Sequence, residues 1–593
     1  MEYDKQLEEY GILAKNAKLD IKDNVLFIES TEIEEINLKT LQEKKTRELI
    51  IKNSKINNLL FTRINNIKLN FECCTFKNQV IAREYNFNNT IAFIECIFES
   101  IVDFSKTTFQ CEVDFFASTF KDETNFTEAR FLVKQRDNNK IAKNNFIKST
   151  FEKDVSFDDV EFHTKVYFVI SHFKAQASFI RTKFLAKQDD NGIIENGFAQ
   201  IIFKGNAYFN DAKFQAKVSF AMSHFEAQAN FTETKFLAKQ DNGRIIENNF
   251  SEVIFEKSAY FNDSVFENFA DFNKCDFREI ANFYGVTFKK TPNFSQTIFN
   301  GSVNLVNANL KFNFKDLQTT INQKYDFYKK SIKITADAII TKSQNKSLDK
   351  FANDFRDSFR VFKNALIKDN NLLDASEFHK YELYSKEIEL DSKENKTIKD
   401  KVEKWQLWFY RKLCDHHTDI LQSFHSLMLV IGLFGLIGLG VIIGFNYYYL
   451  GYKPFSHPYM AKEIYDAHIQ SFIKTHTLYT IIAFNFFILA FYLGMLFISI
   501  LFISIEWIPR GFLICIWKIL RGFFIVVSYV SYVVVICILL VSPKILIPAM
   551  GIFTDKRALL DPLSTLGGIY TIVFGFVLFS FIKTIRKNSI VPN

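Results

Sequence analysis

The densest set of side chains that could do chemistry is the run 415–419, Asp-His-His-Thr-Asp, with His425 nearby. Imidazoles and carboxylates are ligands that zinc and other transition metals take in proteins. Two adjacent histidines point to different sides of a helix, so they would not easily share one ion. We therefore interpret this run as polar residues at the mouth of an apolar segment, and we expect no metal and no other cofactor.

The sequence carries none of the common catalytic patterns. It has no P-loop, Gly-x-Gly-x-x-Gly, His-Glu-x-x-His, nucleophile elbow or zinc-ribbon spacing. The 8 cysteines are scattered without a Cys-x-x-Cys pair, which favours a reducing compartment. A net charge of +7 on 593 residues is too small to indicate nucleic-acid binding. We expect no catalytic residues and no enzyme activity.

The composition divides the chain into a polar part and an apolar part. Residues before about 415 are polar with regularly spaced Phe, and residues after about 421 form long apolar runs. The acidic N-terminus has no basic segment followed by an apolar one, so no cleaved signal peptide is expected. The sequence therefore predicts one soluble part and one membrane part.

The 69 Phe residues are concentrated in the polar part and follow a regular interval. From Phe71 onward the spacing alternates between five and six residues, as at Phe93, Phe98, Phe104 and Phe109. A five-residue step rotates about 140° on a helix, so helical Phe would not form one stripe. On a flat strand, odd and even steps would face opposite sides. The remaining solution is a coil that turns a corner at each step and buries every Phe.

The residue two positions before each Phe supports this interpretation. It is small or β-branched, which suits a second inward position in a narrow interior. The positions are Val113, Ser118, Thr124, Ala129, Ala177, Ala207, Ala212, Val218, Ala229, Ala259, Ala270, Cys275 and Ala281.

The stretch from Val102 to Phe131, VDFSKTTFQCEVDFFASTFKDETNFTEARF, resembles the pentapeptide-repeat family, and with its context the chain resembles the membrane-anchored members. The resemblance covers residues 71–312 and implies a right-handed quadrilateral β-helix of about ten coils. An extra residue in alternate units makes the coil about 22 residues long instead of 20. Some such proteins mimic DNA, but the net charge of about −4 between Phe71 and Leu310 is too small for that role, so no nucleic-acid partner is expected.

Three similar polar inserts interrupt the Phe spacing. They read FLVKQRDNNKIAKNNF at 131–146, FLAKQDDNGIIENGF at 184–198 and FLAKQDNGRIIENNF at 236–250. Phe131 to Phe184 is 53 residues and Phe184 to Phe236 is 52, which is two coils plus eight or nine residues. Because whole coils separate them, the inserts should leave the solenoid from one corner, about 10 Å apart.

The Asn-Gly pairs inside two inserts favour type I′ hairpin turns, so we expect three β-hairpins in a row. One interpretation is a partner-binding row; the other is a harmless loop copied by tandem duplication. The candidate partner-binding residues are Lys187, Gln188, Asn191, Gly192, Lys239, Gln240, Asn242, Gly243 and Arg244.

The two ends of the repeat region read differently. Residues 1–70 predict an irregular first coil or N-terminal cap, which stacked repeats need. Residues 313–415 predict a helical neck, with a helical hairpin from Phe355 to Leu390 that turns at Asn370-Asn371. This hairpin also resembles the helical segment of membrane-bound pentapeptide proteins, which implies a spacer and a dimerisation element.

The segment 401–413, KVEKWQLWFYRKL, combines tryptophans with basic residues immediately before the apolar part. That mixture is typical of a helix lying at a membrane interface. The candidate membrane-interface residues are Trp405, Trp408, Arg411 and Lys412.

Residues 416–593 predict a transmembrane domain. Four segments are long enough to span a bilayer, at about 424–445, 477–505, 522–547 and 563–582. Basic residues gather before the first span, after the second and after the fourth, which predicts cytoplasmic N- and C-termini. We expect a multi-pass protein of the bacterial inner (cytoplasmic) membrane.

We therefore expect a non-enzymatic scaffold or protein-interaction protein that displays a β-helix in the cytoplasm. Its expected partners are the lipid bilayer and a protein of unknown identity, and it could form a homo-oligomer. The alternative is a channel or transporter regulated by the β-helix. Against it, no filter motif is visible, and Asn485 is the main polar residue inside a predicted span.

Overall fold

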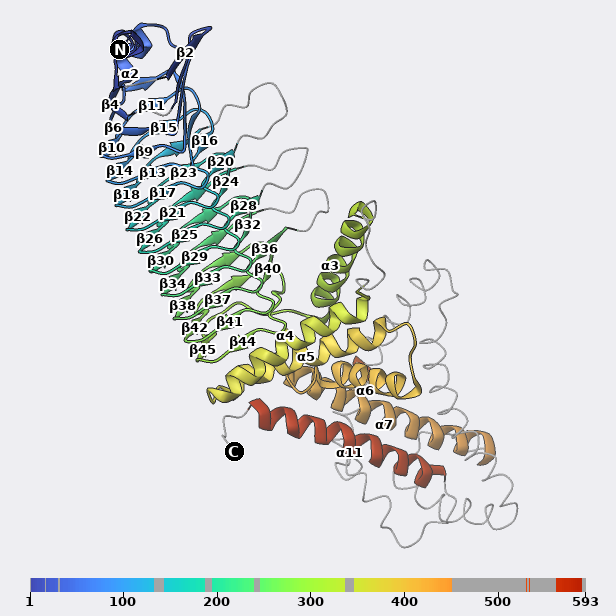
Figure 1. The fold of residues 1–593 in the computed structure, drawn as a ribbon. Coiled ribbons are helices and arrows are strands. Elements are labelled where there is room, and N and C mark those ends of the chain that lie inside the picture. Colours follow the sequence, from blue (N-terminus) through green and yellow to red (C-terminus); the bar gives the residue numbers. More distant parts are fainter. Residues whose placement is uncertain are drawn as a thin grey trace. The chain divides into compact units, whose positions relative to one another are not determined.

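Short parallel strands stacked in four sheets make up most of the first 310 residues (Figure 1). The computed structural model describes residues 2–15, 18–29, 32–132, 143–186, 195–238, 246–335, 346–450, 529–530, 533 and 562–588. The chain divides into two compact units, Met1–Lys401 and Val402–Asn593.

Each coil of the solenoid visits four sheets in the order B, A, D and C. Sheet A contains β1 Ile12–Lys15, β4 Glu32–Asn37, β6 Lys55–Leu60, β9 Thr75–Phe76, β13 Ile97–Phe98, β17 Thr119–Phe120, β21 Thr150–Phe151, β25 His172–Phe173, β29 Ile202–Phe203, β33 His224–Phe225, β37 Ile254–Phe255, β41 Asp276–Phe277 and β44 Ile298–Phe299. Sheet B contains β2 Lys18–Lys22, β3 Val25–Glu29, β5 Glu48–Lys52, β8 Lys68–Glu72, β12 Ile91–Ile94, β16 Val113–Asp114, β20 Lys143–Asn145, β24 Lys165–Tyr167, β28 Glu195–Gly197, β32 Lys217–Ser219, β36 Glu247–Asn249 and β40 Phe269–Asp271.

The other two sheets are shorter. Sheet C contains β7 Ile64–Asn65, β11 Asn86–Phe87, β15 Thr108–Phe109, β19 Arg130–Phe131, β23 Glu161–Phe162, β27 Lys183–Phe184, β31 Lys213–Phe214, β35 Lys235–Phe236, β39 Val265–Phe266 and β43 Thr287–Phe288. Sheet D contains β10 Val80–Ile81, β14 Val102–Asp103, β18 Thr124–Asn125, β22 Val155–Ser156, β26 Ala177–Ser178, β30 Ala207–Tyr208, β34 Ala229–Asn230, β38 Ala259–Tyr260, β42 Ala281–Asn282 and β45 Val303–Asn304.

The Phe side chains form continuous stacks inside the solenoid, as their spacing predicts. Phe209, Phe231 and Phe261 stack on sheet D with ring centroids 4.9 Å apart at each step and rings within 4° of parallel. All three are fully buried. Burying a Phe contributes about 2 kcal/mol each, so these stacks are the main source of stability.

The inward position two residues before each Phe is also confirmed, since all thirteen named residues are buried. At many of these positions a hydroxyl or thiol donates to the carbonyl of a Phe one coil earlier. Ser118 Oγ donates to Phe93 O at 2.7 Å, and Thr234 Oγ1 donates to Phe209 O at 2.7 Å. The small polar side chain thus satisfies a corner carbonyl that no strand partner reaches.

The alternation of five and six residues has a backbone cause. Each five-residue step contains one left-handed residue, such as Lys106 at φ 56° or Ala117 at φ 53°, which turns the corner in a short distance. The six-residue steps bend without such a residue. The three inserts all lie in six-residue steps.

Parallel stacking begins earlier than the Phe pattern does. β3 pairs with β5 and β4 with β6 in parallel register, within the region 1–70 that we expected to be an irregular cap. In the 12-stranded sheet B only β2–β3 is antiparallel, so the stack has about eleven turns, one more than the sequence predicts. Leu26, Ile28 and Leu49 occupy the core positions of Phe in these coils, so the Phe spacing does not reveal the repeat there.

Two short helices belong to the N-terminal end of the solenoid. Helix α1, Glu2–Glu9, packs beside β1, and α2, Leu38–Glu43, lies in the first turn.

Two helices cover the last coil, and together they are the helical hairpin that the sequence predicts. They are α4, Leu348–Lys368, and α5, Leu372–Ser392, with Asn370 at φ 58° in the turn (Figure 1). Phe362 of α4 packs on Phe294 with ring centroids 4.4 Å apart. The apolar face of α4 is therefore used within this chain, against the end of its own solenoid.

Side chains of α4 also accept hydrogen bonds from the open edge of the stack. Phe294 N donates to Ser358 Oγ at 2.8 Å, Gln296 N to Asp357 at 2.7 Å and Val303 N to Asp369 at 2.9 Å. An uncovered edge would leave these donors without partners and open to another strand. The hairpin is thus a C-terminal cap of the solenoid.

The second unit contains two long apolar helices, α7, Ile420–Leu450, and α11, Pro562–Asn588. Phe424 lies 6.0 Å from Phe581 and Phe434 lies 5.0 Å from Tyr570, measured between ring centroids, so the helices run antiparallel. Within the described residues these two helices are long and apolar enough to cross a membrane, over 420–437 and 568–585. They correspond to the first and fourth predicted spans. The span at 477–505 lies outside the described residues, as does 522–547 apart from Tyr529, Val530 and Val533.

Candidate docking surfaces and membrane-interface helix

The three inserts are rooted at one corner of the solenoid, between sheets C and B. The strands before them, β19, β27 and β35, all lie in sheet C, and the strands after them, β20, β28 and β36, all lie in sheet B. Neighbouring roots are two coils apart, with one coil between them, since β23 lies between β19 and β27 in sheet C and β31 lies between β27 and β35. The prediction of a common corner at two-coil spacing is therefore confirmed.

The predicted hairpins themselves, and with them all nine candidate partner-binding residues, lie outside the described residues. These residues fall within 187–194 and 239–245, and the first insert falls within 133–142. Their role stays a prediction. The described part of the site is the set of roots on both sides of each insert.

Each insert root contains an asparagine buried in the solenoid interior. Asn144, Asn196 and Asn248 have no exposed surface, and each occupies the position two before a Phe. The neighbouring coils have Val166 and Val218 at this position. At this position of the described part of sheet B, an amide replaces an apolar side chain only directly after an insert.

These amides are poorly satisfied. Asn144 Nδ2 donates to Thr164 Oγ1 at 2.9 Å, whereas neither amide atom of Asn196 or Asn248 has a hydrogen-bond partner in the part of the chain that the structure describes. A buried polar group without a partner costs about 1–3 kcal/mol. The three asparagines therefore lower the stability of the solenoid itself.

Replacing the interior amides should stabilise the protein. Asn196→Val and Asn248→Val should each raise the free energy of unfolding by about 1–3 kcal/mol, since valine fills the equivalent place one coil away. Asn144→Val should gain less because it loses a hydrogen bond. Urea unfolding of the full-length protein, followed by amide hydrogen exchange in β28 and β36, measures the change. Val218→Asn is the matched reverse substitution, and equal stability of all four variants would contradict this interpretation.

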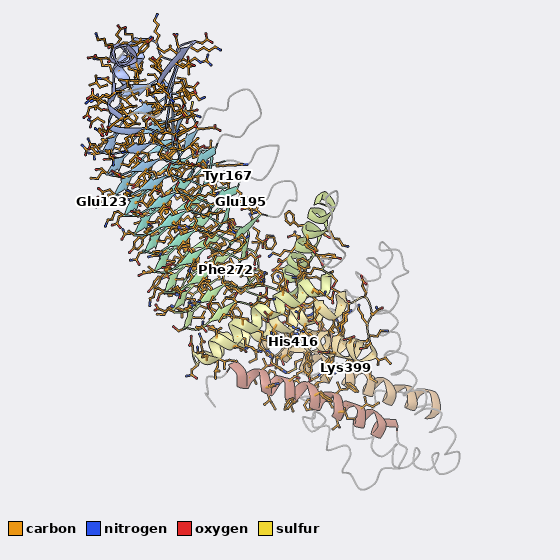
Figure 2. The ribbon with its side chains drawn as sticks, in the orientation of Figure 1. Glu123, Tyr167, Glu195, Phe272, Lys399 and His416 are labelled. Atoms are coloured by element: carbon orange, nitrogen blue, oxygen red, sulfur yellow. The ribbon has the colours of Figure 1, made fainter. Side chains whose placement is uncertain are left out.

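Tyr167 and Glu195 project from sheet B beside the second insert root (Figure 2). The Tyr167 ring lies over Gly197, where an added Cβ would sit 2.7 Å from Tyr167 Cδ1. Burial raises the pKa of Tyr167, and the nearby Glu195 carboxylate adds to the shift. Any larger residue at position 197 would displace the ring, so the glycine allows Tyr167 to pack directly against the insert root.

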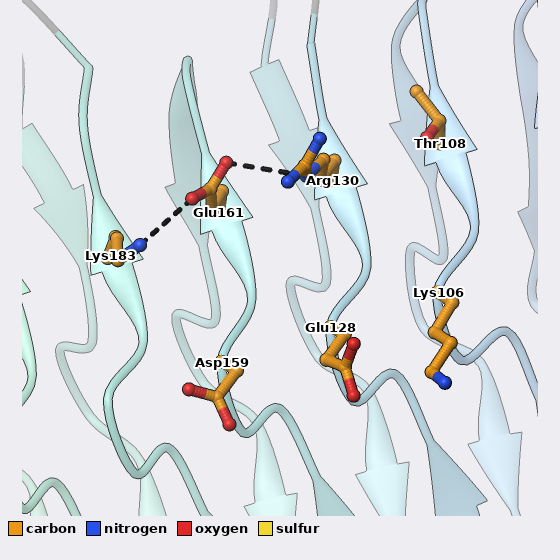
Figure 3. Close-up of a pocket in the computed structure, with 7 residues that line it drawn as sticks. All are labelled: Lys106, Thr108, Glu128, Arg130, Asp159, Glu161 and Lys183. Carbon is orange, nitrogen blue, oxygen red and sulfur yellow. Dashed lines mark hydrogen bonds and ion pairs between the residues drawn. The ribbon is translucent and has the colours of Figure 1, made fainter.

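Sheet C presents two parallel columns of charged side chains (Figure 3). The turn column consists of left-handed residues, and the strand column consists of the outward residue of each strand. The turn column is Lys106, Glu128, Asp159, Arg181, Asp211, Glu233 and Asp263. The strand column is Thr108, Arg130, Glu161, Lys183, Lys213, Lys235 and Val265.

A shallow groove of about 460 Å³ lies between the upper parts of these columns, from Lys106 to Lys183. Ion pairs cross from coil to coil along it. Glu161 lies 3.0 Å from Lys183 and 3.6 Å from Arg130, and Asp159 lies 2.6 Å from Arg181. The Lys183 ammonium lowers the pKa of Glu161, and the Arg181 guanidinium lowers that of Asp159. The groove is polar, open and internally neutralised, which suits protein contact better than small-molecule binding.

Helix α3, Phe314–Thr335, is fastened to sheet B by a lysine that the sequence analysis did not single out. Lys324, with 10% of its side chain exposed, lies 2.6 Å from Glu247, the first residue of β36. Two coils earlier the equivalent Glu195 pairs with Lys217 of the next strand at 3.2 Å, but Phe269 stands at that place beside Glu247. The helix thus supplies the cation that the sheet lacks.

The environment of Lys324 is largely apolar. Its Nζ lies 5.4 Å from the Phe269 ring centre and 5.6 Å from that of Phe355. Burial opposes its charge, but the carboxylates of Glu247 and Asp271 outweigh this and raise its pKa. Burial together with the Glu247 charge raises the pKa of Asp271 to about 6. Sequence reasoning could not find this contact, because 77 residues separate Lys324 from Glu247.

The predicted interfacial segment forms helix α6, Ile398–Cys414, and the boundary between the two units falls inside it. Ile398, Val402 and Trp405 recur at helical spacing and are 82%, 59% and 46% exposed. Trp405 stacks on Phe409 with ring centroids 5.5 Å apart, and Trp408 is exposed at the edge of this face. Arg411 and Lys412 lie in the last turn. All four predicted membrane-interface residues are therefore on one helix with an exposed apolar side.

The Asp-His-His run joins α6 to α7 through an unusual turn. Asp415, His416 and His417 have φ of 46°, 56° and 68°, so the assumption that they are helical was wrong. Each left-handed non-glycine residue costs about 1–2 kcal/mol, so surrounding contacts must hold the turn. Within the described residues no group of three or more His, Cys, Asp or Glu side chains could hold a metal ion.

His417 provides such a contact. Its Nδ1 lies 3.3 Å from Ser580 O, 3.4 Å from Cys414 Sγ and 3.4 Å from Thr584 Oγ1. Ser580 and Thr584 belong to α11, so the imidazole ties the turn to that helix. Gln422 Nε2 also donates to the last carbonyls of α6, those of Arg411 at 2.9 Å and Lys412 at 2.7 Å. The Asp-His-His run thus connects α6 to α7, and His417 holds the connecting turn against α11.

Comparison with known proteins matches one part of the solenoid. A family model described as pentapeptide repeats (9 copies) matches residues 250–298, which contain β37 to β43. No curated protein and no solved structure matches the chain. The solenoid is therefore similar to pentapeptide-repeat proteins over residues 250–298.

Proposed function

We propose that the protein is a membrane-anchored scaffold that displays a pentapeptide-repeat-like β-solenoid to protein partners. The observation that carries the proposal is the exposed Ile398, Val402 and Trp405 face of α6, followed directly by the apolar helix α7. Such a face is unfavourable in water and favourable at the boundary of a bilayer. We further propose that the anchor lies in a cytoplasmic membrane, with both termini in the cytoplasm.

The form of the solenoid supports a binding role. Its interior is filled by stacked Phe, so a ligand can be recognised only on the outer faces or at the corners. The groove on sheet C and the insert roots are the polar surfaces available for this, and both extend over several coils. Extended surfaces of this kind are how solenoid proteins bind other proteins.

Photo-crosslinking at neighbouring positions of α6 tests the membrane contact. A benzophenone side chain at Val402, on the apolar face, should form adducts with phospholipid when the full-length protein is in membranes. The same side chain at Glu403, about 100° around the helix, should form few. Equal adduct yields at both positions would contradict an interfacial α6.

Deletion of the inserts tests the scaffold role. Removing residues 134–142, 187–194 and 239–246, which restores a six-residue step at each root, should abolish specific in-cell crosslinks made from the corner between sheets C and B. Crosslinks made from sheet A should persist, which shows that the solenoid still folds. If the corner yields the same crosslinked proteins with and without the inserts, they are not the binding element. Ion flux in liposomes containing the full-length protein would instead favour a channel.

A further inference from the structure

Opposite charges face each other at many positions on adjacent coils of this solenoid, although pairs of like charges also occur, as at Lys174 and Lys204. Lys77 lies 2.7 Å from Glu99 and Lys174 lies 2.7 Å from Glu152 on sheet A, and Lys257 lies 2.9 Å from Glu279 beside sheet D. In the upper part of sheet C the strand column alternates as Arg130, Glu161 and Lys183, whereas Glu128 and Asp159 are neighbouring acids in the turn column. Like charges on directly opposed strand positions are destabilising, so alternation of charge stabilises the stack.

The lower part of the two columns on sheet C departs from this alternation. Asp211, Glu233 and Asp263 follow one another in the turn column, and we call them the acidic stripe. Lys183, Lys213 and Lys235 follow one another in the strand column, and we call them the lysine stripe. The Phe rings beneath them, Phe184, Phe214, Phe236 and Phe266, are spaced 4.4, 5.3 and 4.4 Å apart, so neighbouring charges are about one strand spacing apart.

These charges are exposed and mostly without a partner in the chain. Asp211, Lys213, Glu233 and Asp263 are exposed and Lys235 is half-buried. In the described part of the solenoid no ion pair joins any of these five side chains to an opposite charge, whereas Lys183 pairs with Glu161 at 3.0 Å. Each stripe repels itself within one molecule. A surface of opposite pattern lying against the two stripes would offset this repulsion.

We propose that the partner of this face is a second copy of the chain, with the two solenoids side by side and parallel. A two-fold axis running along the solenoid, between the stripes, sets the turn column of each copy against the strand column of the other at the same height. Opposite charges then meet at the two middle coils, whereas Asp263 faces Val265 and Lys183 faces Arg181, each of the latter two being paired within its own copy. Asp211 then meets Lys213 of the second copy, and Glu233 meets Lys235. A two-fold axis across the solenoid would instead set acid against acid and lysine against lysine.

The parallel arrangement agrees with a common anchor, and this part rests on the proposed function. Two copies in one bilayer are both attached at the C-terminal ends of their solenoids, and confinement to the membrane raises the effective concentration of one copy near the other. Exposed ion pairs are individually weak, so association should be reversible and should weaken as ionic strength rises.

Charge reversal with two tags tests the proposal on the full-length protein. Copies with different tags are co-expressed, membranes are solubilised, and recovery of the second tag with the first is measured. The acidic variant is K213E/K235E and the basic variant is D211K/E233K/D263K. Each variant paired with itself should lose recovery to the level of an untagged control. The acidic variant paired with the basic one should regain wild-type recovery, because the contacts between positions 211 and 213 and between positions 233 and 235 are again attractive.

A control variant and a zero-length crosslink complete the test. K153E/K204E makes the same charge change at exposed sites away from sheet C and should associate like the wild type. Carbodiimide coupling of a mixture of ¹⁴N- and ¹⁵N-labelled chains should join Lys213 to Asp211 and Lys235 to Glu233 between copies. Undiminished self-association of either reversed variant, or failure of the mixed pair to associate, would overturn the proposal. Either result in a protein that remains membrane-bound leaves the anchor intact; a protein found outside the membrane fraction refutes the anchor instead.

Discussion

Phe231→Ala should lower the free energy of unfolding by about 3–5 kcal/mol, which is the usual effect of removing a large buried ring. Phe231 is fully buried and stacks on Phe209 and Phe261, with ring centroids 4.9 Å away on both sides. It also meets Phe220 and Phe250 edge-on, at 5.5 and 5.8 Å. No other side chain can fill the gap, because its neighbours are held in stacks of their own.

Amide hydrogen exchange in the full-length protein measures this effect coil by coil. Because each coil contacts only its neighbours, protection should fall most in β30, β34 and β38 and less at the two ends. Phe231→Leu, which keeps much of the apolar volume, should lose clearly less. Thr232→Ala on the adjoining surface is the matched control. A loss from Phe231→Ala no greater than from Thr232→Ala would show that the stacks do not hold the solenoid together.

Lys324→Met should lower the free energy of unfolding by about 3–5 kcal/mol near neutral pH, since it removes a buried cation and leaves the partly buried carboxylates of Glu247 and Asp271 without it. Lys324 lies 2.6 Å from Glu247, with Asp271 close enough to raise its pKa. Methionine keeps most of the volume between the Phe269 and Phe355 rings, so the change removes mainly charge. Urea unfolding, with exchange measured in α3, reports the loss. The double variant Lys324→Met/Glu247→Gln should recover part of it.

The same cluster gives a pH dependence of defined sign. The pKa of Asp271 is about 6 in the folded protein and about 3.9 in an unfolded chain. The folded state therefore binds this proton more tightly, and the free energy of unfolding contributed by Asp271 falls as pH rises from about 4 to about 6, then stays level. Asp271→Asn should remove this slope and raise stability above pH 6 by about 3 kcal/mol, which is the free-energy equivalent of the pKa difference. An unchanged slope between the two proteins would assign it to other groups.

The solenoid could be predicted from the sequence because its signal is local and repeated. Alternating steps between Phe residues such as Phe93 and Phe98 exclude a helix and a flat strand, and the corner of the inserts follows from residue counting. The first coils could not be recognised from the Phe spacing, because Leu26 and Leu49 occupy the buried core positions there. The helical hairpin was predicted from its apolar faces, but its role as a cap depends on contacts with Phe294, more than 60 residues away.

The parts that could not be predicted depend on contacts between distant residues or on backbone conformation. In the sequence Lys324 cannot be distinguished from a solvent-exposed lysine, because its burial depends on the packing of α3 beside Phe269. The left-handed turn at His416 contains no glycine, which is the residue that usually indicates such a conformation in a sequence. The interior asparagines did carry a signal, since Asn196 stands two residues before a Phe, where the other repeats have small or β-branched residues. This position in the repeat would have been enough to predict that the amide is buried.

The most direct test of a membrane-anchored cytoplasmic scaffold is protease accessibility in carbonate-washed vesicles of known orientation. The account predicts that the full-length chain remains in the washed membranes. It also predicts that protease added to the cytoplasmic face cleaves in the non-helical link 393–397 between α5 and α6, releases the solenoid and leaves fragments that begin near α6 in the bilayer. Release of the intact chain by carbonate, or digestion of the solenoid only from the opposite face, would contradict it.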